Sequence, residues 1–105
     1  NQDGLVNIND ILEYPPEPTE YNLHSVYPNP VNPTTTIKYD IPKDSQVSIT
    51  VFNLTGKKIE TLVNTDQSTG MYTFEWNAEQ FPSGVYFIKM KTESFTKIQK
   101  VILVK

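Results

Sequence analysis

The stretch that decides the fold class is TTTIKYDI, residues 34–41. In its second half the apolar residues Ile37, Tyr39 and Ile41 alternate with two charged residues. Side chains on an extended strand point alternately to opposite faces, so this pattern predicts a strand with one buried and one solvated face. The alternation recurs at residues 47–51, 72–76 and 86–90, and further apolar segments lie at residues 59–63 and 95–104.

Turn-forming residues separate these segments. They include Pro42 with Asp44, then Gly56, and then Gly70. Glycine supplies positive φ angles, and Asp and Asn side chains form local turns. Residues 21–105 contain no segment with the period of an amphipathic helix. The pattern therefore predicts an all-β protein, an antiparallel β-sandwich of about seven strands.

The segment before the first strand, YPNPVNP at residues 27–33, holds three prolines. Proline cannot donate to a strand ladder, so we expect this segment at an edge or outside the sheet. Two interpretations stay open. A stiff segment loses little entropy when a partner binds it, which suits a recognition feature. Alternatively, it guides the chain into the first strand and blocks aggregation between strand edges.

Composition divides the chain into three parts. Residues 13–20, EYPPEPTE, combine three prolines with three glutamates, which is typical of a semi-rigid extended linker. We therefore predict a calcium-loop remnant at residues 1–12, a linker at residues 13–22 and a folded domain at residues 23–105. Because the chain begins with Asn1 and not Met, we expect it to be the C-terminal piece of a longer protein.

Charge and cysteine content exclude several functions. The chain has no cysteine, so disulfides and thiolate metal sites are excluded. The net charge is −3, and all nine basic residues are lysine. Without arginine the usual bidentate contacts to bases and phosphates are missing, so nucleic acid is not an expected partner. No apolar run approaches the about 20 residues that span a bilayer, so membrane insertion is not expected either.

Residues 1–10, NQDGLVNIND, place oxygen-bearing residues around a glycine in the order of a calcium loop. The stretch resembles the second half of a dockerin-type calcium repeat, without the aspartate that normally opens the loop. Three interpretations stay open: a remnant of an upstream repeat, a weak calcium site completed by water or a neighbouring molecule, or a plain polar turn. The candidate metal ligands are Asn1, Asp3, the Leu5 carbonyl, Asn7 and Asp10.

No catalytic arrangement stands out. His24 is the only histidine, and its neighbour Ser25 does not make a triad, which needs a nucleophile, a base and an orienting group in register. We predict that the chain is not an enzyme and needs no cofactor. Trp76 lies on the apolar side of an alternating segment, which favours a place in the core over a sugar-stacking platform.

Four segments together resemble a known family, the type A C-terminal sorting domain of the type IX secretion system. They are YPNPVNPTTTIKYDIP (27–42), VSITVFNLTGKKIETLV (47–63), GMYTFEWNAEQFPSGVYFIKM (70–90) and KIQKVILVK (97–105). The resemblance implies an immunoglobulin-like β-sandwich that directs a larger cargo protein, already in the periplasm, through the outer-membrane translocon. A sortase-like protease then removes the domain, and the cargo stays at the cell surface or is released outside the cell.

The resemblance also implies recognition residues in three motifs, and a cleavage site between Tyr14 and His24. The motif residues are Pro28, Asn29 and Pro30, then Gly84, Val85 and Tyr86, and last Lys97, Lys100 and Lys105. If residues 97–105 form an edge strand, its free backbone can pair with the translocon by strand addition, or with a second copy in a dimer. Otherwise the lysines protect an ordinary edge.

Two other functions stay open at this point. One is a structural immunoglobulin-like module, similar to the sandwich of flagellar hook-capping proteins. The other is a carbohydrate-binding module of a secreted multidomain protein, which the dockerin-like start would suit. A buried Trp76 would count against the second.

Overall fold

The computed structural model describes residues 18–105. This part of the chain contains seven strands and no helix, which confirms the predicted all-β class. The strands are β1 (Asn22–Leu23), β2 (Thr34–Ile41), β3 (Ser45–Asn53), β4 (Lys58–Gln67), β5 (Gly70–Asn77), β6 (Gly84–Lys91) and β7 (Thr96–Leu103). No helix in the described range could cross a membrane. The candidate calcium ligands at residues 1–10 lie outside it.

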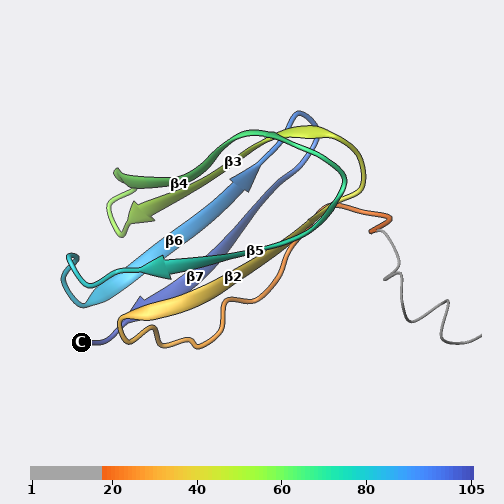
Figure 1. The fold of residues 1–105 in the computed structure, drawn as a ribbon. Coiled ribbons are helices and arrows are strands. Elements are labelled where there is room, and N and C mark those ends of the chain that lie inside the picture. Colours follow the sequence, from red (N-terminus) through yellow and green to blue (C-terminus); the bar gives the residue numbers. More distant parts are fainter. Residues whose placement is uncertain (1–17) are drawn as a thin grey trace, which may run out of the picture.

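The strands form two antiparallel sheets that pack as a sandwich (Figure 1). A three-stranded sheet has the order β1-β2-β5, and a four-stranded sheet has the order β4-β3-β6-β7. This is an immunoglobulin-like arrangement in which the fourth strand pairs with the third and not with the fifth. The predicted sandwich is therefore confirmed.

The core lies between the sheets and is built by the predicted alternation. On β2, Ile37 and Ile41 are fully buried while Lys38 is exposed. On β6, Ile88 and Met90 are fully buried in the same way. Burying one large aliphatic side chain contributes about 1.5–3 kcal/mol, so these inward-facing rows dominate the stability of the sandwich.

Trp76 on β5 belongs to this core. Its side chain is only 1% exposed, and its ring meets Tyr86 edge to face at a centroid distance of 6.2 Å. The indole Nε1 donates a hydrogen bond of 3.0 Å to Glu60 Oε1 on β4, so the one polar atom of the ring is paired across the two sheets. Burial of Trp76 confirms its predicted core position and removes the sugar-stacking platform.

The turn between β3 and β4 depends on the particular residues at its start and at its tip. The β3–β4 connection runs through Asn53, whose Oδ1 accepts hydrogen bonds from the Thr55 and Lys57 backbone N–H groups, both at 3.0 Å. Gly56 follows at φ 88°, a left-handed conformation in which a side chain would be strained. The turn lies beside the start of β6, because Asn53 pairs with Tyr86, and it is therefore close to the site described next.

Candidate recognition site

Three segments that are far apart in the sequence meet where β7 ends. Leu103 pairs with Gly84 of β6 on one side and forms a parallel bridge with Val31 on the other. The three motifs that the resemblance singled out therefore lie next to one another, in the order first motif, last strand, second motif. We call this junction of residues 28–31, 84–86 and 100–105 the converging edge.

Asn29 binds the outer side of β7 through its side chain. The amide Nδ2 donates to the Lys100 carbonyl at 3.2 Å, and the amide Oδ1 accepts from the Ile102 N–H at 3.0 Å. A side-chain amide carries the same donor and acceptor as a peptide group. Asn29 thus takes the place that a residue of a neighbouring strand would take.

Val31 continues this pairing through its backbone. Its N–H donates to the Ile102 carbonyl at 2.7 Å, and its carbonyl accepts from the Val104 N–H at 2.9 Å. The Val31 side chain is fully buried, which anchors the segment in the core. Although β7 is the last strand of its sheet, its outer edge is therefore occupied at residues 100–104. An added strand cannot pair there unless residues 29–31 leave.

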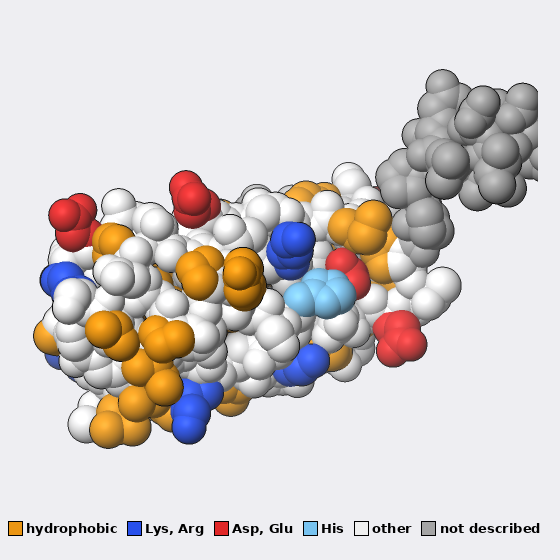
Figure 2. Space-filling view, turned by 90° about the horizontal axis from the view of Figure 1, so that it is seen from below, with side chains coloured by type: hydrophobic (Ala, Val, Ile, Leu, Met, Phe, Trp, Pro, Cys, Tyr) orange, Lys and Arg blue, Asp and Glu red, His pale blue; other side chains and the backbone are white. Residues whose placement is uncertain are grey.

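The prolines of the first motif face solvent. Pro28 and Pro30 are exposed, and the peptide bonds that precede both are cis. The Pro28 carbonyl accepts a hydrogen bond of 2.7 Å from Thr35 Oγ1, which ties the segment to β2. Figure 2 shows hydrophobic side chains gathered beside lysines at the end of the molecule where β7 ends.

The second motif contributes mainly to the fold. Gly84 opens β6 at φ 157°, a backbone conformation that other residues rarely adopt. Tyr86 is 5% exposed, and its hydroxyl donates to the Pro82 carbonyl at 2.5 Å. Val85 lies between them, half-buried, on the outer face of the sheet. Of the three residues, only Val85 presents its side chain to the outer face.

The lysines of the last motif have different surroundings. Lys105 donates from its backbone N–H to Ser83 Oγ at 3.1 Å and from Nζ to the Glu79 carbonyl, which fixes the chain end against the loop before β6. Lys97 Nζ donates to Asn22 Oδ1 at 3.0 Å, at the opposite end of β7. Lys100 is exposed on the outer face.

Several contacts of the converging edge were not predicted from sequence. Val31, Ser83 and Glu79 took no part in the motif assignment. Val31 does carry a signal, because it is the one apolar residue in the run PNPVNP and so suits a buried anchor. Ser83 and Glu79 make contacts to a partner over 20 residues away, which no local pattern indicates.

His24 makes a hydrogen bond at the surface and not a catalytic contact. Its Nε2 lies 2.8 Å from Asp40 Oδ2, and the half-exposed pair is flanked by Asn22, whose Nδ2 lies 3.3 Å from His24 Nδ1. Ser25 is exposed and takes no part in these contacts. The arrangement offers no nucleophile in line with the histidine.

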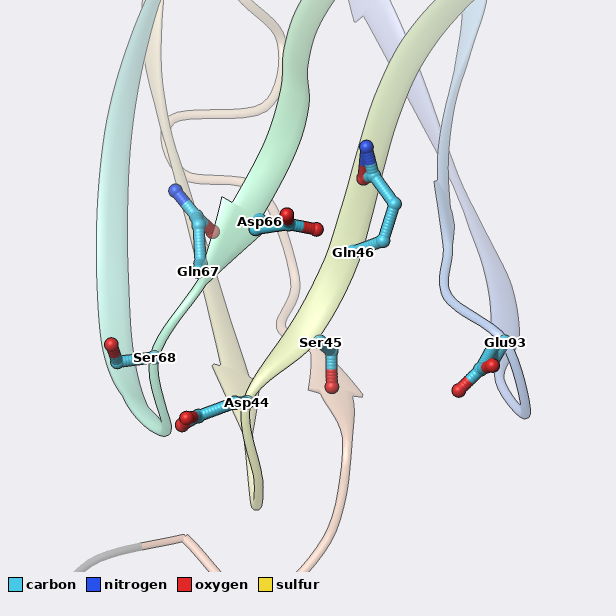
Figure 3. Close-up of a pocket in the computed structure, with 7 residues that line it drawn as sticks. All are labelled: Asp44, Ser45, Gln46, Asp66, Gln67, Ser68 and Glu93. Carbon is cyan, nitrogen blue, oxygen red and sulfur yellow. The ribbon is translucent and has the colours of Figure 1, made fainter.

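A polar hollow lies at the far end of the sandwich, away from the converging edge (Figure 3). Its acidic lining comes from Asp44, Asp66 and Glu93, on three separate segments, and one carboxylate, that of Asp44, accepts a hydrogen bond of 3.0 Å from the Thr69 N–H. Figure 3 shows the carboxylates spread around the hollow and not directed at one point. Residues 18–105 contain no group of three or more acidic or histidine side chains that could hold a metal ion.

Two tyrosines have shifted pKa values. The hydrogen bond with Ser45 lowers the pKa of the Tyr21 hydroxyl, although desolvation opposes the shift. Burial raises the pKa of Tyr39 above its ordinary value of 10.0, against the effect of its hydrogen bond to Gln67. Neither tyrosine belongs to the converging edge, so proton transfer has no visible part there.

The described part of the chain is thus a small β-sandwich in which segments of three motifs meet at one strand edge. The model of one family, described as the secretion system C-terminal sorting domain, matches residues 25–105. The chain therefore belongs to this family, and it carries a C-terminal sorting signal for type IX secretion. The family consists of sorting signals and not of enzymes, and it implies interaction with the secretion machinery and export to the cell surface or beyond. A comparison with curated proteins found no match.

Proposed function

We propose that the converging edge is the part of this domain that the type IX machinery recognises. On this proposal the domain is of type A, and it takes its cargo from the periplasm through the outer-membrane translocon. The observation that carries the proposal is the junction at Leu103, where the first and second motifs flank the last strand. A partner that binds at this one place contacts residues of all three motifs, although Lys97 lies at the opposite end of β7.

The associated sortase-like protease then removes the domain within the interval Tyr14–His24. Burial supports a position before β1, because a protease needs an exposed, extended backbone. Thr19 and Glu20 are exposed, whereas Leu23 in β1 is fully buried and hydrogen-bonded into the sandwich through its carbonyl. Residues 14–17 of this interval lie outside the described part of the chain.

A secretion assay with matched asparagine variants tests this function. The 105-residue chain is fused behind a periplasm-directed reporter in a bacterium with a working type IX system. Asn29→Ala removes both side-chain bonds to β7. Asn32→Ala is the control, because Asn32 is exposed and lies three positions further on without binding β7.

We expect export of the unmodified fusion and of Asn32→Ala, and retention of Asn29→Ala in the periplasm. Thermal unfolding of both variants must show that they stay folded. Export of a folded Asn29→Ala at the normal level would contradict recognition through the converging edge. Failure of the unmodified fusion, in a host that exports its own cargo, would contradict the sorting function itself.

A further inference from the structure

The outer face of the four-stranded sheet carries one row of side chains that crosses all four strands. Phe52 of β3 pairs with Phe87 of β6, and these two aromatic residues are flanked by Lys58 of β4 on one side and by Lys100 of β7 on the other. The neighbours Val51 and Ile88 are fully buried, so strand alternation turns both phenylalanines outward. Lys89 Nζ lies 5.9 Å from the centre of the Phe52 ring, which confirms that they share this face.

The charged side chains on this part of the face are all positive. Lys58, Lys89 and Lys100 surround the aromatic pair, and the outward positions of β3, β6 and β7 carry no acidic residue. The nearest carboxylate on the outward row of β4 is that of Asp66, which lies at the far end by the polar hollow. Three of the nine lysines therefore lie around the aromatic pair, in a chain whose net charge is −3.

Apolar surface accompanies these charges. Ile102, on the outward row of β7, is 40% exposed, and Leu54 at the tip of the β3–β4 turn is 69% exposed. A shallow hollow separates that turn from the start of β6 and is lined by Leu54, Ser83 and Val85 among others. It lies next to the aromatic row, and it offers room for an apolar side chain of a partner.

We propose that this face, with Phe52 and Phe87 at its centre, binds an acidic protein surface of the secretion machinery, whose carboxylates lie on both sides of an apolar centre. The proposal rests on the proposed function, and it extends the contact surface from the converging edge across the outer face to Lys58 and Lys89, which belong to none of the three motifs. Charge complementarity selects the partner, because lysines on both sides of an apolar pair match carboxylates around an apolar patch. Such a polar rim around an apolar core is the usual anatomy of protein interfaces.

A protein surface suits this face better than a lipid surface. Side chains on a rigid sheet stand only a short way above the backbone, and Phe52 and Phe87 are half-buried, so they cannot insert deeply into a bilayer. The net charge of −3 also opposes approach to an anionic membrane. Lipid binding is therefore the competing outcome of the test.

The test compares two double charge reversals in the same reporter fusion. Lys58→Glu with Lys89→Glu reverses two charges on the proposed face. Lys38→Glu with Lys43→Glu makes the same change in net charge on the other sheet and in the β2–β3 turn. A photo-crosslinking residue at position 61, an exposed position on β4 that pairs with Thr50, captures the partner. One at position 73, exposed on the outer face of the other sheet, serves as its control.

We expect the face variant to lower both export and crosslinking at position 61 by about tenfold, the factor that about 1.4 kcal/mol represents. The control variant should export normally, and position 73 should give no adduct. Equal export of both folded variants, or adducts at both positions, would overturn the proposal. Because the unmodified fusion is measured alongside, a failure of this face is distinguishable from a failure of sorting.

Flotation of the 105-residue chain with phosphatidylglycerol vesicles tests the lipid outcome. We expect no flotation. If the chain floats without any protein adduct at position 61, and if Lys58→Glu with Lys89→Glu abolishes both flotation and export, the face binds lipid and the protein partner is ruled out.

Discussion

Tyr39 shows how one polar atom is accommodated inside this sandwich. Its side chain is 2% exposed and its ring stacks on Tyr72 at a centroid distance of 5.3 Å. The hydroxyl donates to Gln67 Oε1 on β4 at 2.7 Å, so the bond joins the two sheets. Loss of this hydroxyl would leave the partly buried Gln67 oxygen without its donor, which costs more than the bond itself contributes.

We predict that Tyr39→Phe lowers the free energy of unfolding by about 1 kcal/mol near neutral pH. The variant should also change the response to alkali. Burial raises the pKa of Tyr39 above 10.0 in the folded state, so the folded protein holds this proton more tightly than the unfolded chain. The contribution of Tyr39 is thus fully present below pH 10.0 and is lost as the pH rises through the folded-state pKa.

Urea unfolding at pH values below and above 10.0 measures both effects. The difference between the wild type and Tyr39→Phe should shrink on the alkaline side, since only the wild type loses this contribution. The lowered pKa of Tyr21 acts in the opposite direction but is common to both proteins. Tyr27→Phe, which removes a hydroxyl from a side chain that is 79% exposed, is the matched control. A difference that is constant across this pH range would refute the assignment.

At the scale of the elements, the apolar alternation predicted which face of a strand is buried, but it did not predict which strands pair. In β2, β3 and β6 the buried side chains are the apolar rows that the sequence indicates. The prediction works there because polar residues occupy the opposite, solvated face of each strand. On β7 both faces carry apolar residues, with Val101 and Leu103 buried and Ile98 and Ile102 exposed. The period of two could therefore not indicate which of the two apolar faces of β7 is buried.

The pairing of the first motif with β7 was also beyond sequence reasoning. Three prolines indicated an edge position for residues 27–33, and the structure agrees. Which edge they meet depends on contacts across more than 70 residues, made through the Asn29 side-chain amide and the Val31 backbone. Residue type identifies Asn29 as a hydrogen-bonding group, but only the fold determines its partner.

We predict that the Ile102 amide is protected from hydrogen exchange although it faces away from β6. In Asn29→Ala its exchange should become about three to ten times faster, which corresponds to a net hydrogen bond of about 0.5–1.5 kcal/mol. The Val101 and Leu103 amides face β6 and should not change. The Val104 amide, held by the Val31 carbonyl, is a second internal reference. Exchange at Ile102 that is fast already in the wild type would contradict the occupied edge.

At the scale of the whole molecule, the last strand is part of the core as well as of the recognition site. Val101 is fully buried and Leu103 is 1% exposed. Loss of one large buried side chain costs about 2–5 kcal/mol, and a small domain has only about 5–15 kcal/mol in total. Deletion of β7 should therefore unfold the sandwich.

We predict that a chain lacking residues 97–105 is unfolded, with a flat thermal melt and rapid digestion by protease. Such a truncation abolishes sorting for a reason unrelated to recognition, so the point variants at Asn29 and on the outer face are the informative ones. Lys100→Ala is the matched comparison, because it changes an exposed side chain of the same strand and should leave the melt unchanged. A truncated chain that melts cooperatively near the wild-type temperature would show that β7 is dispensable for the fold.

The pairing of Val31 with β7 also constrains the order of events during synthesis. The ribosome makes residues 29–31 early in this domain, but their hydrogen-bond partners at residues 100–104 emerge some 70 residues later. A polypeptide that stops before those partners cannot assemble the junction, whatever precedes it. The recognition site therefore forms only on cargo whose synthesis has continued through β7, so that incompletely translated cargo lacks a functional sorting signal.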